Sequence, residues 1–121
     1  MTNTVINLAQ KLTLINDQWK PRVVAEMNDY QFKLVKLEGE FIWHKHDDTD
    51  EVFYIVDGAL TIELRDGNVL LNSGDMYVVP KGVEHRPVAE TECQVMLVEP
   101  KGTTNTGNMD GELTAENDVW I

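Results

Sequence analysis

Four residues in two short stretches of the sequence have side chains suited to binding a transition metal. His44, His46 and Glu51 lie in the first stretch, and His85 lies in the second. Imidazole nitrogens and a carboxylate together suit iron, manganese, nickel, cobalt or zinc, and the ligand types alone do not select one of these ions. The chain has only three histidines, and all three belong to this set. This concentration favours a metal site over unrelated surface histidines.

The spacing of His44 and His46 requires an extended backbone if both are to bind one ion. Alternate side chains of a β-strand point to the same face, whereas in a helix these two would lie about 200° apart around the axis. We expect Gly39 to begin a strand that carries both histidines. After an acidic loop, Glu51 opens a second strand at about 52–56, which is rich in β-branched and aromatic residues.

The rest of the chain predicts further short strands separated by turns. Asp57-Gly58, Asp66-Gly67 and Pro80-Lys81-Gly82 are turn signals. The alternation between Tyr30 and Glu38 changes phase near Val35, which predicts a bulge or burial of both faces there. Besides the strand that begins at Gly39, strands are expected at about 22–27, 30–38, 52–56, 59–65, 69–71, 75–79, 83–89 and 92–99. About nine short strands with almost no helix indicate a β-sandwich or small barrel.

The two ends of the chain differ from this pattern. Residues 5–15 mix helical and alternating spacing, and we expect a short helical turn that leads into an edge strand. Residues 100–121 are polar and glycine-rich and are expected to form an extended tail. The tail ends in Val119-Trp120-Ile121, and these apolar residues are predicted to pack on the chain's own barrel or on a partner subunit.

These motifs resemble those of the cupin superfamily. Its first motif, G-x5-H-x-H-x3/4-E-x6-G, is matched by Gly39, His44, His46, Glu51 and Gly58, with four residues instead of five after the first glycine. Its second motif, G-x5-P-x-G-x2-H-x3-N, is matched by Gly74, Pro80, Gly82 and His85, with Ala89 in place of the final asparagine. That asparagine is not a metal ligand in the family pattern. The chain resembles the small single-domain bacterial cupins loosely labelled mannose-6-phosphate isomerase-like.

The resemblance implies an all-β fold, the cupin double-stranded β-helix or jelly-roll barrel, with a short N-terminal helical turn and an extended C-terminal tail. Residues 1–121 would form a single cupin domain with its core at about 22–99 and the tail at 100–121. It further implies one divalent metal ion bound by His44, His46, Glu51 and His85 in the mouth of the barrel. Small cupins are commonly dimers, so a homodimer is expected.

Two classes of function fit a centre of three histidines and one glutamate. Four protein ligands leave two positions open in octahedral coordination, so a metalloenzyme that acts on a small molecule, as a dioxygenase, isomerase or lyase, is mildly favoured. The alternative is a non-catalytic module that binds or senses a small ligand, and a purely structural metal fits least well. No catalytic residue stands out. Possible proton donors are Tyr54 and Tyr77, and possible pocket walls are Trp43, Phe53 and Met76, although core packing explains each equally well.

Composition excludes several partners. The chain of 121 residues carries a formal net charge of −11, which argues against nucleic acid and anionic membranes as partners. It has three arginines, Arg22, Arg65 and Arg86, so a highly phosphorylated substrate is disfavoured. No apolar run approaches the length of a membrane span, and Met1 to Gln10 lacks the features of a signal peptide. A cytoplasmic protein is therefore expected. Cys93, the single cysteine, lies in an alternating apolar run and is expected to be a buried thiol.

Overall fold

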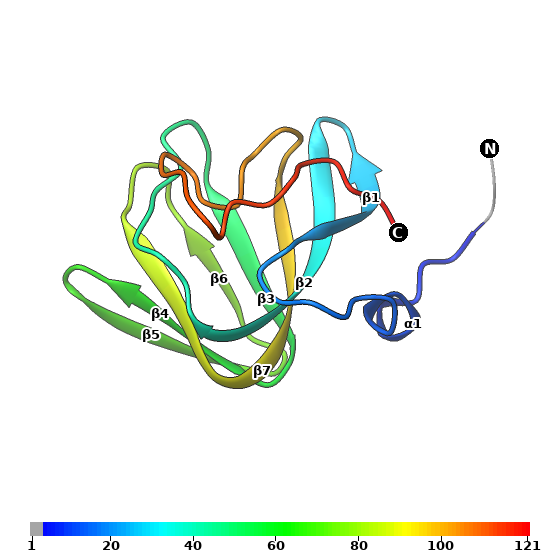
Figure 1. The fold of residues 1–121 in the computed structure, drawn as a ribbon, viewed down its shortest axis with the longest axis horizontal. Coiled ribbons are helices and arrows are strands. Elements are labelled where there is room, and N and C mark those ends of the chain that lie inside the picture. Colours follow the sequence, from blue (N-terminus) through cyan, green and yellow to red (C-terminus); the bar gives the residue numbers. More distant parts are fainter. Residues whose placement is uncertain (1–3) are drawn as a thin grey trace.

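The computed structural model describes residues 4–121, and this range contains one short helix and seven strands. In chain order they are α1 (Leu8–Leu12), β1 (Arg22–Met27), β2 (Tyr30–Glu40), β3 (Glu51–Asp57), β4 (Ala59–Leu64), β5 (Gly67–Asn72), β6 (Met76–Val79) and β7 (His85–Pro100). Figure 1 shows the strands curving around one interior, with α1 outside it. The all-β fold predicted from the sequence is confirmed.

The long strand β7 joins the two halves of the barrel. Its first residues, 85–88, pair with β4, which forms a hairpin with β5. Its later residues, 94–98, lie between β2 and β3 in the strand order β1-β2-β7-β3-β6. All of these pairings are antiparallel. Because one strand belongs to both halves, the sheet closes into the jelly-roll barrel of the prediction.

Side-chain alternation places the core inside this barrel. On β3 the buried residues are Glu51, Phe53 and Ile55, which share one face as predicted. The main apolar cluster fills the interior and includes Val35, Leu37, Phe41, Leu60, Ile62, Val79, Cys93, Val95 and Leu97. Cys93 is a buried free thiol, as expected, and burial raises its pKa to about 11.

Strand β2 buries both of its faces, which explains the change of phase seen in the sequence. Val35 belongs to the main cluster, whereas Leu34 packs on the outside against Leu12 of α1. The inward face of the same strand begins with Gln31 and Lys33, which are 0% and 4% exposed. The barrel interior near the start of β2 is therefore polar.

The strand predictions need four corrections. The histidines lie outside the regular strands, because β2 continues through Gly39 to Glu40 and residues 41–50 contain only an isolated bridge between His44 and His85. The two strands predicted at 83–89 and 92–99 are one, β7. The predicted nine strands are accordingly seven among residues 4–121. The helical turn is confirmed as α1, but no edge strand follows it within the predicted stretch at 5–15.

The C-terminal tail docks on its own barrel, which was one of the two predicted alternatives. It crosses one end of the barrel and returns to β1 (Figure 1). The Val23 N–H donates to the Val119 carbonyl at 2.7 Å, and the Ile121 N–H donates to the Val23 carbonyl at 3.1 Å. Ile121 also packs against the cluster beneath α1. The apolar chain end thus adds a short parallel bridge to the edge of the sheet.

Asp57-Gly58, which is typical of a hairpin turn, joins β3 to β4, but these two strands do not form a hairpin, because each pairs with β7 and not with the other. Gly58 provides a direct test of this turn. Its φ is +100°, and a Cβ there would lie 3.1 Å from the Cys93 Cα. We expect Gly58→Ala to lower the free energy of unfolding by about 1–3 kcal/mol, because an L-residue is strained at this φ and is also crowded by β7. Gly74→Ala is the matched control, because Gly74 has a φ of +89° and open space around it. Equal losses in urea unfolding of the two variants would show that the contact with β7 is unimportant.

Candidate metal centre

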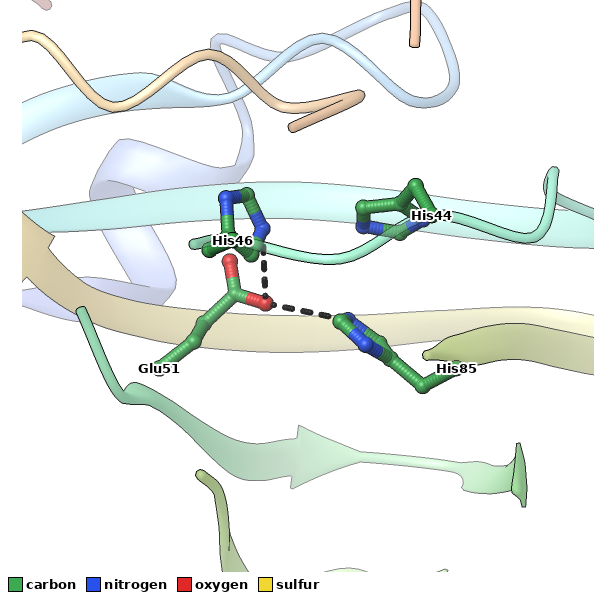
Figure 2. Close-up of side chains that lie close together, drawn as sticks. All are labelled: His44, His46, Glu51 and His85. Carbon is green, nitrogen blue, oxygen red and sulfur yellow. Dashed lines mark ion pairs between the residues drawn. The ribbon is translucent and has the colours of Figure 1, made fainter. Parts of the chain in front are cut away.

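The four predicted ligands converge at one point inside the barrel. One donor atom from each of His44, His46, Glu51 and His85 lies within 4.8 Å of all the others, and all four residues are buried. Figure 2 shows the two histidines of the 41–50 segment facing Glu51 and His85 across the site. The Oε1 atom of Glu51 lies 3.4 Å from Nε2 of His46 and 3.4 Å from Nε2 of His85.

These separations fit a shared ion. Ligand atoms about 2.1 Å from one ion lie about 3 Å apart when adjacent and about 4.2 Å apart when opposite. The observed separations exceed these values by only a few tenths of an ångström. Small side-chain adjustments would therefore bring all four donors to bonding distance.

Backbone carbonyls orient two of the imidazole rings. Nδ1 of His44 lies 2.9 Å from the Ile42 carbonyl, and Nδ1 of His85 lies 3.0 Å from the Val83 carbonyl. A carbonyl only accepts hydrogen bonds, so each Nδ1 carries the proton in the neutral ring. Each Nε2 then keeps its lone pair, directed into the site. This is the arrangement that a metal-ligating histidine needs.

Several donor atoms at the site have no partner within the protein. Among residues 4–121, five buried side-chain polar atoms lack a hydrogen bond, and three of them are Nε2 of His46, Nε2 of His85 and Oε1 of Glu51. A buried unsatisfied polar group costs about 1–3 kcal/mol. The concentration of such atoms at one point, with nitrogen and oxygen donors together, fits a bound divalent cation. The chain can therefore hold a metal ion here.

The electrostatic environment keeps the donors in the forms that bind a metal. Burial lowers the pKa of His44 to about 4, and the neighbouring His85 acts in the same direction. His44 is thus neutral near pH 7. Burial alone would raise the pKa of Glu51, but the nearby imidazoles of His46 and His85 outweigh this effect and lower it. Metal ligands must be deprotonated, and both groups meet that condition.

A buried ion pair that sequence reasoning missed lies beside the ligands. Glu99 on β7 is 1% exposed and Lys33 on β2 is 4% exposed, and the Lys33 Nζ lies 3.5 Å from the Glu99 Oε2. Lys33 also donates to the Thr103 carbonyl at 3.3 Å. Burial and the negative charge of Glu51 raise the pKa of Glu99 well above its ordinary value. The sequence could have indicated the burial of Lys33, because Lys33 lies two residues before the buried Val35 and therefore on the same face of the strand.

Two cavities of different character adjoin the site. An apolar cavity of about 30 Å³ is bounded in part by His44, Glu51 and Phe53, and it has room for a molecule the size of water. A larger polar groove of about 440 Å³ reaches His46 from outside. One of its walls is the loop at 47–49, and the other comes from the tail between Pro100 and Asn108. A small molecule can therefore approach His46 through a groove lined by carboxylates, hydroxyls and one lysine.

Most of the other predicted site residues lie elsewhere. Phe53 does line the apolar cavity. Met76 is 63% exposed on the outside of the barrel, and Trp43 lies under the Arg65 guanidinium, whose central carbon is 3.7 Å from its ring centroid. Tyr77 packs at the margin of the core. Neither it nor Tyr54, which faces away from Glu51 on β3, lines the two cavities beside the site.

Comparisons with known proteins agree with this fold and site. The family model for the Cupin domain matches residues 32–99. The chain belongs to this family, and the resemblance noted in the sequence is confirmed. The same stretch contains all four predicted ligands.

Three relatives illustrate the range of the family. A cupin-2 domain protein of Shewanella frigidimarina has a crystal structure that matches 80% of this chain and 95% of its own, with 61% sequence identity and a TM-score of 0.79. An uncharacterized protein of Bacillus subtilis, YdbB, is 34% identical over 64% of this chain and 70% of its own length. Acireductone dioxygenase of Bacillus licheniformis is 34% identical over 66% of this chain. The match covers 48% of the length of that relative.

Within residues 4–121, no helix is long and apolar enough to cross a bilayer.

The pKa of His44 predicts how acid affects the metal-free protein. Its value falls from 6.5 to about 4 on folding, so between these values the unfolded chain binds a proton that the folded protein does not. The contribution of His44 to stability is therefore complete above pH 6.5 and is lost as the pH falls toward 4. At about 1.36 kcal/mol per pH unit, the loss reaches about 3 kcal/mol.

Urea unfolding at a series of pH values, with chelator present, measures this loss. The His44→Gln variant is the control, because its side chain is polar and does not titrate. We expect its free energy of unfolding to fall less than that of the wild type between pH 6.5 and 4. Parallel curves for the two proteins would contradict a buried neutral His44.

Proposed function

We propose that this chain is a metalloenzyme of the cupin family that acts on a small molecule at an ion bound by His44, His46, Glu51 and His85. The observation that carries the proposal is the group of buried, unpartnered donor atoms of His46, Glu51 and His85. A barrel that needed these side chains only for packing would have no reason to leave them unsatisfied. The ion is divalent iron, manganese, nickel, cobalt or zinc.

The position of the groove supports a catalytic ion rather than a structural one. Three histidines and one carboxylate leave two octahedral positions for other molecules. The polar groove reaches His46 directly, so a substrate can come close to those positions. An ion held by these four residues would supply Lewis-acid or dioxygen chemistry at the site. The carbonyls of Ile42 and Val83 orient two of the ligand rings. An apolar cavity adjoins His44 and Glu51.

The relatives favour oxygen chemistry among the reactions open to such a centre. One curated relative is named as a dioxygenase, and its likeness covers 66% of this chain at 34% identity. We therefore place dioxygenase activity first, ahead of isomerase and lyase activity. Asp47 and Asp48 line the groove together with Lys101, so a neutral or weakly charged substrate fits it better than a multiply charged anion.

Metal content tests the proposal first. We expect wild-type protein purified without added metal or chelator to carry close to one equivalent of a transition metal, measured by elemental analysis. His46→Ala should lose most of it, because the variant lacks one imidazole ligand, and it should keep the circular dichroism of a folded β-protein. Wild type that is metal-free and cannot be loaded with Fe²⁺, Mn²⁺, Ni²⁺, Co²⁺ or Zn²⁺ would refute the metal centre.

Oxygen consumption then separates an enzyme from a binding module. The metal-loaded wild type is tested with an oxygen electrode against a panel of small diols, hydroxy acids and hydroxylated aromatic compounds, and product analysis under nitrogen detects isomerase or lyase turnover. We expect consumption that His46→Ala lacks. Metal-dependent binding without any turnover would support the alternative, a non-catalytic cupin that binds or senses a small ligand.

We also propose that the chain forms a homodimer through the outer surface of β3, β6 and β7. The cross-strand pairs Val52 with Val78 and Tyr54 with Met76 place apolar side chains on this surface. Met76 and Val78 are 63% and 43% exposed. An apolar surface that continues across neighbouring strands is typical of an interaction site, and it offers two acidic molecules a contact without like charges.

Met76→Glu should convert such a dimer to monomers, because it places a charge in the contact. Leu70→Glu is a matched control, since Leu70 on β5 is also 63% exposed but lies outside this surface. Sedimentation velocity on the wild type and both variants gives the oligomeric state. A monomeric wild type, or equal dissociation in both variants, would refute the proposed contact.

A further inference from the structure

The segment that carries His44 and His46 forms backbone hydrogen bonds on one side to residues 82–87, including one from the Gly82 N–H to the His46 carbonyl at 2.8 Å. It lies between β2 and β3, where residues 41–50 form only one isolated bridge. On one side, the His44 N–H donates to the His85 carbonyl at 3.1 Å and the His85 N–H donates to the His44 carbonyl at 2.9 Å. This pair fixes two of the ligands relative to each other. The N–H and carbonyl of Lys45 point to the opposite side of the segment. They need hydrogen-bond partners from another part of the chain.

The C-terminal tail satisfies both of these groups with a single residue. The Asn108 N–H donates to the Lys45 carbonyl at 3.0 Å. In return, the Lys45 N–H donates to the Asn108 Oδ1, also at 3.0 Å. Asn108 therefore takes the place that a neighbouring strand would have beside the histidine segment. Hydrogen bonds to opposite sides at successive residues are those of a strand within a sheet.

Gly107 brings the tail into direct contact with the same segment. Its φ is +60°, and a Cβ at this position would collide with the Lys45 carbonyl and lie 3.2 Å from Cδ2 of the His44 ring. Only glycine lets the backbone approach so closely. The tail thus packs against one ligand ring as well as against the backbone between the two ligands.

The tail is itself built to hold this position. Thr106 is fully buried, and its hydroxyl lies 2.9 Å from the Met109 carbonyl and 2.8 Å from the Thr114 hydroxyl. The side chain of Asn105 donates to the Trp19 carbonyl at 3.1 Å and accepts from the Ala115 N–H at 2.8 Å. These hydrogen bonds fix the part of the tail that directly precedes Gly107 and Asn108 in the sequence. A loosely attached tail would not need buried polar groups satisfied in this way.

We infer that Gly107 and Asn108 are positioning residues for the metal ligands, so that the C-terminal tail is a working part of the metal centre. This inference rests on the proposed metal site. Asn108 holds the backbone of Lys45, between His44 and His46, in the position from which both imidazole rings can bind one ion. Gly107 limits the tilt of the His44 ring. The same part of the tail forms one wall of the groove that reaches His46, so ligand geometry and access to the site depend on one segment.

Substitution of Asn108 tests the inference. Asn108→Ala removes Oδ1 and leaves the Lys45 N–H without its partner. We expect its affinity for Co²⁺ to fall about 10-fold, the lower end of the range for groups that orient a ligand. The visible absorption of the bound Co²⁺ should change as well, because the ligand geometry changes. Competition with a chelating dye gives the affinity, and the absorption spectrum is recorded in the same titration.

Two further variants separate positioning from general damage. Asn108→Asp keeps an oxygen acceptor at the same place and should restore most of the affinity and the wild-type spectrum. Asn117→Ala removes another asparagine of the tail, whose side chain reaches only Gly102 and Thr104, and should leave both unchanged. The melting temperatures of the metal-free variants show whether each protein is folded.

The outcomes distinguish this inference from the proposed function. Wild type that binds no Co²⁺ would refute the metal centre itself. Wild type that binds Co²⁺, with Asn108→Ala binding equally tightly and with the same spectrum, would overturn only the role of the tail. Equal losses in Asn108→Ala and Asn117→Ala would overturn it too, because they would show an unspecific loosening. Loss in Asn108→Ala alone, with rescue by Asn108→Asp, supports it.

Discussion

The central constraint on this barrel is the burial of four polar ligands in an apolar interior. Removing an imidazole or a carboxylate from water is costly unless another group takes the place of water. Here Nε2 of His46, Nε2 of His85 and Oε1 of Glu51 face one another with no such group. The arrangement is stable only if the surrounding structure holds the four side chains against their tendency to separate. Much of the fold around the site serves this purpose.

The supports act on different atoms of the same ligands. The carbonyls of Ile42 and Val83 fix the rings of His44 and His85 from behind, and the paired backbone of these two histidines fixes their separation. Glu51 begins the regular strand β3 and needs less help. The irregular segment at 41–50 is bound to residues 82–87 on one side, and the tail meets its other side through Asn108. The centre therefore combines rigid strands with one segment that depends on distant residues.

The sequence was informative where local rules decide the structure. Alternation and turn chemistry placed β1, β3, β4 and β6 within about one residue, and the phase of Glu51 correctly put Phe53 and Ile55 on its face. It was misleading for β7, where strands were predicted at 83–89 and 92–99, whereas residues 90–92 belong to one continuous strand and lie at a shift of register against β2. It also misplaced the histidines in a strand, because a single bridge and an extended loop give the same alternation.

What the sequence could not supply were contacts between residues far apart in the chain. Nothing in a polar, glycine-rich stretch distinguishes Gly107 and Asn108 from solvent-exposed loop residues. Asn108 lies 63 positions after Lys45 in the sequence, and their contact is seen only in the folded chain. Glu99 and Lys33 are 66 positions apart. The burial of Lys33 could have been predicted from the alternation along its strand, but its pairing with Glu99 could not.

The charges in the interior complete the argument for a bound cation. Two carboxyl groups, Glu51 and Glu99, share the space with one ammonium group, that of Lys33, and the buried His44 is neutral near pH 7. Burial raises the pKa of Glu99, and the negative charge of Glu51 raises it further. A divalent cation beside Glu51 would supply the missing charge and satisfy the unpartnered donors in one step. The acidic exterior, with a net charge of −11 for the whole chain, would attract such cations to the groove.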